Sequence, residues 1–204
     1  MRIGILGSGV VGRTLATGWA PYGHETRIGT RDEMQPELDG FDTGSLADVA
    51  AWAELVVVAV VGASAETLAR DLALALAGKV VIDATNPLDF SSGGPQLFVG
   101  TDDSLGERVQ RAAPDARVVK AYNTVGNLLM VDPQLDGGPP TMPIAGDDED
   151  AKATVLDLLE QTGWDPIDIG GISASRWLEP MALVWTAYGI RSGTWTHAFR
   201  LLRG

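Results

Sequence analysis

Two hydrophobic periodicities alternate along the chain. Short runs rich in Val, Ile and Leu, some of them apolar at every position, are typical of strands buried on both faces of a parallel sheet. They predict strands at Arg2–Leu6, Glu25–Gly29, Leu55–Val61, Lys79–Ala84, Arg117–Ala121 and, as the last strand, Thr141–Ala145. Apolar positions three and four residues apart predict helices at Val10–Tyr22, Leu46–Ala53, Ser64–Leu76, Leu105–Ala113 and Asp147–Gln161. The alternation predicts an α/β fold with a doubly wound, mainly parallel sheet and crossover helices.

The chain follows a different pattern after residue 170. From Ser173 to Leu202 the apolar spacing is helical, with weak points at Pro180 and at Gly189 and Gly193, and no further strand is predicted. This segment is too small to form a core of its own. We therefore expect a sheet-containing domain over residues 1–170 and a helical appendage over residues 171–204, which packs on the sheet or on a second subunit.

Composition excludes several kinds of chemistry. The chain has 204 residues, of which 45% are hydrophobic and none is cysteine, so disulfides, thiolate metal sites and cysteine nucleophiles are absent. Gly7 interrupts the apolar run that follows Met1, which argues against a signal peptide. The apolar stretch Pro180–Ile190 is far shorter than the ~20 residues of a membrane span. We expect a cytoplasmic protein that does not enter the membrane.

Charge is strongly and unevenly distributed. The formal net charge is −12, from 27 acidic and 15 basic residues, which argues against binding to nucleic acid or to an anionic membrane. Residues 171–204 nevertheless carry about +3, because four arginines face one glutamate there. Such an asymmetry guides an anionic ligand toward one region. The acidic cluster Asp147–Asp150 opens a predicted helix, so we interpret it as a helix cap and predict no metal site.

A glycine motif follows the first predicted strand directly and opens the first predicted helix. It consists of Gly7, Ser8, Gly9, Val10, Val11 and Gly12. In this G-x-G-x-x-G pattern the first glycine permits a tight turn. The second leaves room for a pyrophosphate beside the backbone, and the third lets the helix pack closely on the strand. The free N–H groups of the helix start bind the anion. This context predicts a dinucleotide-binding Rossmann fold, with a plain glycine turn as the alternative.

The end of the second predicted strand distinguishes NAD from NADP. An NAD site usually has an acidic residue there, which binds the ribose hydroxyls. This chain has Thr30 and Arg31 instead, a hydroxyl and a permanently charged forked donor that suit a 2′-phosphate. Asp32 follows and is expected to face solvent or to pair with Arg31. The sequence therefore predicts NADP(H); the alternative is that Arg31 is an ordinary surface arginine.

Further segments carry a resemblance to a known family. Besides residues 1–32, they are 80–87 (VVIDATNP), 118–125 (VVKAYNTV), 145–148 (AGDD) and 176–180 (RWLEP). They are similar to the coenzyme F420-dependent NADP oxidoreductase family, and the resemblance spans nearly the whole chain. The NADPH-binding domain of membrane metalloreductases looks similar as well. The resemblance implies direct hydride transfer between NADP(H) and a deazaflavin.

The resemblance also implies where the ligand lies. It places Ser8, Val10 and Val11 on the phosphate loop, Thr30 and Arg31 at the 2′-phosphate, Val60 and Val61 beside the dinucleotide, and Asn86, Pro87, Asn123, Thr124 and Val125 beside the nicotinamide. Independently, ligands bind beyond the carboxyl ends of parallel strands, where these segments are predicted. No catalytic residue is assigned, because the cofactors carry the chemistry and the protein positions two rings.

Other reactive side chains have a structural and a functional interpretation. Lys120 ends a buried strand, which favours a structural or phosphate-linked role over a catalytic one. His24 opens a strand and is interpreted as structural. His197 is expected on the surface of the C-terminal helix, with acceptor contact as the alternative. Trp177, Trp185 and Trp195 recur at helical spacing. That spacing is more typical of a core or dimer seam than of a stacking wall for an acceptor.

The residues predict an NADP(H)-binding protein, and the family resemblance implies an NADPH-dependent oxidoreductase that acts on coenzyme F420. Two alternatives remain open. One is a reductase of another small-molecule acceptor, such as a flavin, ferric ion or an imine, although an imine reductase is expected to have a longer helical C-terminal domain. The other is a non-catalytic NADP(H)-sensing module. We also expect a homodimer that forms through the appendage.

Overall fold

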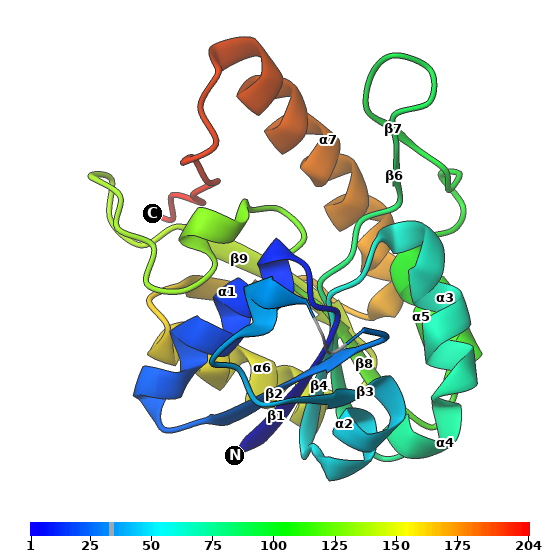
Figure 1. Cartoon of the computed structure of the whole chain (residues 1–204). Helices are drawn as coiled ribbons and strands as arrows, with labels where there is room; N and C mark the ends of the chain where they lie inside the picture. The colour runs from blue at the N-terminus through cyan, green and yellow to red at the C-terminus, as the bar shows by residue number, and fades with distance from the viewer. Residues whose placement is uncertain (33–34) are drawn as a thin grey trace.

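The protein is built around one eight-stranded sheet. The computed structural model describes residues 1–32 and 35–204. The strands of the sheet are β1 (Arg2–Leu6), β2 (Glu25–Thr30), β3 (Thr43–Ser45), β4 (Leu55–Val58), β5 (Val80–Asp83), β8 (Arg117–Lys120), β9 (Thr141–Gly146) and β10 (Asp165–Asp168). Their order is β10-β9-β8-β5-β4-β1-β2-β3, and only the β8–β9 pair is antiparallel among the described strand pairs of this sheet. The predicted doubly wound Rossmann architecture is confirmed (Figure 1).

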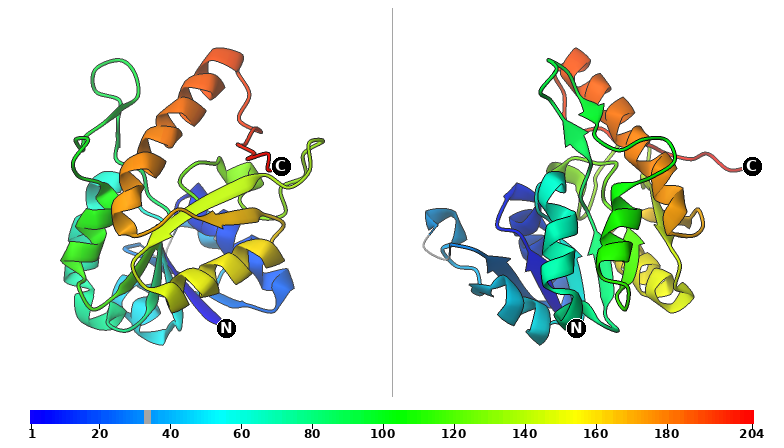
Figure 2. Two further views of the ribbon diagram at one scale, coloured as in Figure 1. Left: turned by 180° about the vertical axis from the view of Figure 1, so that it is seen from behind. Right: turned by 90° about the vertical axis from the view of Figure 1, so that its right-hand side faces the viewer.

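Helices cover both faces of the sheet. They are α1 (Val10–Trp19), α2 (Leu46–Trp52), α3 (Gly62–Asp71), α4 (Ala73–Leu76), α5 (Leu105–Ala112), α6 (Glu149–Gln161) and α7 (Ser175–Ser192). Successive strand residues point to opposite faces, so Ile3 and Ile5 pack with α1 and α6, whereas Val56 and Val58 pack with α2, α3 and α5. Figure 1 and the left-hand view of Figure 2 show α1 and α6 on one side of the sheet and α3 and α5 on the other.

Two expectations about the strands are wrong. Thr141–Ala145 is not in the last strand, because β10 follows it and extends the sheet beyond β9. The four residues of β10 are polar at both ends and contain Pro166, a composition that sheets accept on an edge strand and that gives no period-two signal. The run Leu55–Val61 is a strand only as far as Val58. The remaining apolar residues form the turn into α3, and apolarity alone cannot separate such a turn from a buried strand.

The C-terminal helix also differs from its prediction. α7 runs through Pro180 without a new segment starting there, and it ends at Ser192, where Gly193 adopts a left-handed conformation with φ of 70°. His197 and Trp195 therefore lie outside the helix. In Figure 1, α7 rises away from the sheet beside the β6–β7 hairpin (Leu88–Asp89 and Gln96–Leu97).

The tail after α7 folds back onto the body of the protein. Thr141 donates its backbone N–H to the Phe199 carbonyl at 2.9 Å. Arg203 donates to both carboxylate oxygens of Asp165 at 2.6 Å. The His197 ring stacks on the Trp185 ring with 4.6 Å between centroids, and Trp185 Nε1 donates to the His197 carbonyl at 2.8 Å. The appendage is thus attached to the β9–β10 edge of the sheet.

Candidate functional site

A crevice opens where the chain connections of the sheet change direction. From β1 the chain continues to β2 and β3 on one side of β1, and then returns to β4 on the opposite side of β1. The carboxyl ends of β1 and β4 therefore form a topological switch point. Open α/β sheets bind ligands at this point. The cavity there has a volume of about 510 Å³. Of the predicted site residues, it is lined by Gly7, Ser8, Gly9, Thr30, Arg31, Val60 and Val61.

A side chain would meet different surroundings at each of the three loop glycines. Gly7 has φ of +132°, and a Cβ at this position would lie 2.4 Å from the Ala59 carbonyl oxygen. A Cβ on Gly12 would lie 2.0 Å from the Gly7 carbonyl oxygen, so close packing of α1 on the loop excludes a side chain. A Cβ on Gly9 would meet nothing within 4 Å. The protein itself therefore does not require glycine at position 9, and the open space fits a ligand that approaches the backbone.

Two of the helices that begin at the crevice, α1 and α3, lack side-chain caps. The N-cap residues of α2, α5 and α6 are Ser45, Ser104 and Asp148, whose side chains accept backbone N–H groups in the first turn. The Asp148 bond confirms that the acidic cluster caps a helix. The N-cap residues of α1 and α3 are Gly9 and Val61, and neither helix has a side-chain cap or an acidic residue in its first turn. Their first N–H groups and positive dipole ends are thus available to an anion.

The end of β2 is connected to the phosphate loop. The Thr30 hydroxyl donates to Ser8 Oγ and accepts from the Asp32 N–H, both at 3.2 Å. Arg31 lies exposed on the rim of the cavity. Arg13, one turn into α1, donates from Nη1 to the Ser8 carbonyl at 2.6 Å. Thr30 therefore holds the loop as well as facing the cavity, whereas the Arg31 guanidinium is the cation at the rim.

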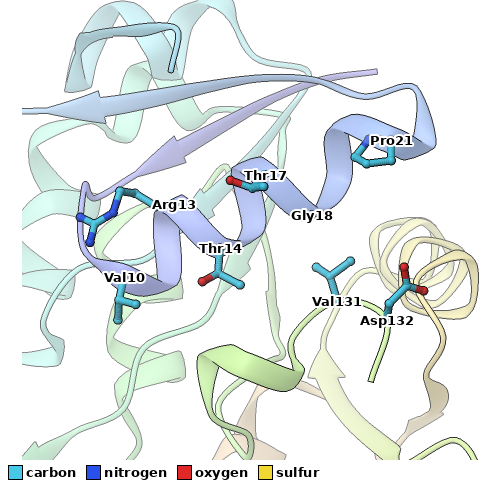
Figure 3. Close-up of a pocket in the computed structure, with 8 residues that line it drawn as sticks. All are labelled: Val10, Arg13, Thr14, Thr17, Gly18, Pro21, Val131 and Asp132. Carbon is cyan, nitrogen blue, oxygen red and sulfur yellow. The ribbon is translucent and has the colours of Figure 1, made fainter. Parts of the chain in front are cut away.

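Two predicted loop residues point elsewhere. Val11 packs against the hydrophobic core between the sheet and helices α1 and α6. Val10 lies in a second depression of about 550 Å³, which runs along the outer side of α1 (Figure 3). Thr14, Thr17 and Val131 line this groove further along the helix. The groove shares no lining residue with the crevice, so Val10 faces away from the cavity at the switch point.

The segments predicted beside the nicotinamide come together at the carboxyl ends of β5 and β8. Asn86 Nδ2 donates to the Asn123 carbonyl at 2.8 Å, and Asn123 Nδ2 donates to Asn86 Oδ1 at 3.2 Å. Pro87, Thr124 and Val125 are buried. These five residues do not line the cavity at the switch point. Their role as nicotinamide contacts stays a prediction.

Lys120 is sequestered. Its side chain is fully buried and its Nζ lies 2.9 Å from Asp83 Oδ2 and 3.1 Å from Glu179 Oε1. Burial by itself lowers the pKa of Lys120, but the two carboxylates outweigh it and raise that pKa above its ordinary value. The amine is thus a buried cation with both carboxylates as partners. This agrees with the structural interpretation of Lys120.

Sequence reasoning missed the wall formed by α3. Ser64, Thr67, Leu68 and Asp71 lie on one side of this helix and line the cavity, together with Leu46 of α2. Their spacing of three and four residues marks one helix face. That face was recognisable as amphipathic, but only the parallel pairing of β1 with β4 places it beside the glycine loop.

Residues 1–32 and 35–204 contain no group of three or more His, Cys, Asp or Glu side chains arranged to hold a metal ion. None of the helices described is long and apolar enough to cross a bilayer.

The parallel sheet, the glycine loop and the two uncapped helix starts define a dinucleotide-binding Rossmann protein. Residues 2–87 match the family described as NADP oxidoreductase coenzyme F420-dependent. The F420-dependent NADP reductase of Methanothermobacter marburgensis is 31% identical over 200 residues, covering 88% of each chain. The chain belongs to the family of coenzyme F420-dependent NADP oxidoreductases, and it is an NADP-dependent oxidoreductase.

Solved structures and longer relatives extend the comparison. A crystal structure from Arthrobacter sp. FB24, proposed to be an F420-dependent NADP-reductase, shares 42% identity, a TM-score of 0.93 and full coverage of both chains. The metalloreductase STEAP3 of Rattus norvegicus is 30% identical over 89% of this chain, which spans 36% of that protein's length. A reductive aminase of Aspergillus terreus has a TM-score of 0.66 at 19% identity, which shows a shared fold.

Proposed function

We propose that the protein transfers a hydride between NADP(H) and the deazaflavin coenzyme F420. The observation that carries this proposal is the full-length similarity to the F420-dependent NADP reductase, whereas the metalloreductase match covers 36% of that relative's length. The closely similar Arthrobacter structure supports the same acceptor. These homologous relatives are named for different electron acceptors. The experiment must therefore identify the acceptor of this protein.

The crevice supplies what the dinucleotide needs. The uncapped starts of α1 and α3 would bind the pyrophosphate, and the open space above Gly9 would admit it. Arg31 would pair with the 2′-phosphate, which explains a preference for NADP(H) over NAD(H). The bound cofactors supply the hydride chemistry, and the residues of this chain bind and orient the two rings. The hydride would pass directly from one ring to the other, and the one proton that completes the reduction of the deazaflavin would come from solvent, so no acid or base of the protein is assigned.

The test is a spectrophotometric assay on the purified full chain. Oxidised F420 is mixed with NADPH, loss of the deazaflavin absorbance is followed, and the assay is repeated with NADH. Rapid bleaching with NADPH and little with NADH would support both the acceptor and the role of Arg31. Parallel assays use a flavin, a ferric chelate and a cyclic imine. Turnover with one of these and none with F420 would refute the deazaflavin proposal.

A non-catalytic NADP(H) sensor is the other candidate. Titration of NADPH fluorescence with the protein measures binding independently of turnover. Tight NADPH binding without oxidation by any of the four acceptors would favour the sensor. Glu66→Gln is a suitable control variant, because Glu66 is exposed and pairs only with Arg70 of the same helix among the ion pairs described.

We also propose that two copies of the protein associate through α7. This helix presents Trp177, Val184 and Tyr188 on one side, with exposed fractions of 66%, 60% and 53%. Their spacing of seven and four residues forms an apolar stripe along the helix. The region that carries the stripe has a net charge of about +3 in a chain of −12, so two copies that meet there repel each other less than two acidic surfaces would.

Light scattering coupled to size-exclusion chromatography tests this association. We expect the wild type at twice the monomer mass of 21.5 kDa, and the Val184→Glu variant at the monomer mass. Leu74→Glu is the matched control, since Leu74 is 96% exposed on α4 and should not affect association. A wild type that elutes as a monodisperse monomer would refute the proposal.

A further inference from the structure

Three charged side chains form a cluster that is buried from solvent where α7 contacts the sheet. Asp83 ends β5, Lys120 ends β8 and Glu179 lies in the second turn of α7; all three are 0% exposed. Lys120 Nζ has three acceptors within hydrogen-bond distance. They are Asp83 Oδ2 at 2.9 Å, the Thr85 carbonyl at 2.7 Å and Glu179 Oε1 at 3.1 Å. All three protons of the ammonium group are therefore used.

Glu179 links a second element to this cluster. Its Oε2 accepts the Leu105 N–H and its Oε1 accepts the Gly106 N–H, both at 3.0 Å. These are the first N–H groups of α5, where a carboxylate is favoured by the helix dipole. A single side chain of α7 is thus bound to β8 through Lys120 and to the start of α5 through the backbone.

The residue before Glu179 makes the neighbouring contact. The Leu178 carbonyl accepts from Asn123 Nδ2 at 2.8 Å, and Asn123 is paired with Asn86. The second turn of α7 is therefore bonded directly to the segment after β8 and, through Asn123, to Asn86 after β5. Beyond this turn the helix rises away from the carboxyl edge of the sheet (Figures 1 and 2). A small rotation at the second turn moves the far end of the helix by a much larger distance.

We propose that Glu179 is a positioning residue for the acceptor. Through Lys120 and the start of α5 it sets the angle of α7 over the nicotinamide edge, and α7 forms one wall of the acceptor site. This inference rests on the proposed hydride transfer to a second ring. Loss of the Glu179 charge changes the placement of the acceptor and leaves the dinucleotide crevice intact, because no residue of the Asp83–Lys120–Glu179 cluster lines that cavity.

Glu179→Gln is the direct test, because glutamine keeps the size of the side chain and removes the charge beside Lys120. Glu66→Gln is the control for the same chemical change on an exposed helix. We expect kcat/KM for F420 to fall about tenfold or more in Glu179→Gln, since misplacement by about 1 Å can cost about a hundredfold. The Kd for NADPH, measured by fluorescence, should stay equal to that of the control.

A purely structural role predicts a different result. General loosening of the fold would weaken NADPH binding and acceptor turnover together, and it would not respond to a charge-conserving change. Glu179→Asp retains the carboxylate, so it should recover part of the lost kcat/KM. Equal loss of NADPH affinity and acceptor turnover, or no recovery in Glu179→Asp, would overturn the positioning role.

Amide hydrogen exchange gives a readout that does not depend on turnover. In Glu179→Gln, we expect faster exchange at the Leu105 and Gly106 amides and along α7, with unchanged exchange in α1. Unchanged exchange at Leu105, Gly106 and α7 would refute the inference even if F420 is not the acceptor. If the wild type fails to reduce F420 while Glu179→Gln shows the expected exchange pattern, only the proposed acceptor is refuted. Should Glu179→Gln not fold, Glu179→Asp is compared with wild type by the same exchange measurement.

Discussion

Lys120 offers a quantitative test of the buried charge cluster. Its replacement by methionine, which is similar in length, removes the one cation shared by Asp83 and Glu179. Each carboxylate keeps other donors: Thr85 N–H and Oγ1 for Asp83, and two backbone N–H groups of α5 for Glu179. Nevertheless two negative charges remain at positions that solvent does not reach.

The cost follows from the loss of the ammonium group. Removing one partner of a buried ion pair typically destabilises a protein by about 3–5 kcal/mol, because the remaining charge is left uncompensated. With two carboxylates affected and with backbone donors retained, we expect Lys120→Met to lower the free energy of unfolding by about 3–5 kcal/mol. For a protein of this size that loss corresponds to a decrease in Tm of about 6–20 °C.

Urea denaturation followed by tryptophan fluorescence measures the effect. Lys79→Met is the control, because Lys79 Nζ donates to the carbonyls of Ala50 and Ala51 near the surface rather than to a carboxylate. The control should lose about 1 kcal/mol or less. If Lys120→Met is destabilised no more than Lys79→Met, the reasoning from buried charge is wrong.

Three further predictions concern the crevice and the attachment of α7. Arg31→Ala should weaken NADPH binding by about tenfold or more while leaving NADH binding unchanged, because a charge-assisted phosphate contact is lost; an equal loss for both cofactors in fluorescence titrations would contradict this. Gly12→Ala should weaken binding of both cofactors, since its Cβ would displace the Gly7 carbonyl that lies 2.0 Å away; wild-type affinity would show that the loop tolerates a side chain. Hydrogen bonds from Arg176 lower the pKa of Glu107 from its ordinary 4.5, so this carboxylate stabilises the fold above pH 4.5 and the stabilisation is lost as the pH falls below that value. The difference in unfolding free energy between wild type and Glu107→Gln should therefore be about 1 kcal/mol at pH 7 and vanish in acid, and a pH-independent difference would refute it.

The crossover pattern was predictable because local and tertiary preferences agree. β1, α1 and the glycine loop combine an apolar run, a turn that requires glycine and an amphipathic helix. Every level of the sequence therefore indicates the same structure. The end of β2 carried a similarly clear signal, because Thr30 and Arg31 occupy a position whose chemistry is fixed by the fold. Capping by Ser45 and Asp148 was also legible, since a side-chain cap acts within its own first turn.

Elsewhere the sequence had no local signal to give. β10 is a strand because β9 offers it an open edge. The end of α7 differs, because Gly193 is a weak point visible in the sequence; it adopts the left-handed conformation that ends the helix at Ser192, whereas the helical spacing alone predicted a longer helix. The tail that includes His197 depends on contacts with Trp185, which arise only after the chain has turned back.

The site divides in the same way. The sequence by itself determined the glycine loop between β1 and α1, because the turn and the helix start are contained within a short stretch of chain. Tertiary structure alone decided that α3 lines the crevice and that Val10 faces away from it. It also decided that Lys120 is paired with Asp83 and Glu179. Those contacts join residues far apart in the chain. The physical reason is that burial and charge pairing depend on which strands become neighbours, and hydrophobic periodicity does not encode that order.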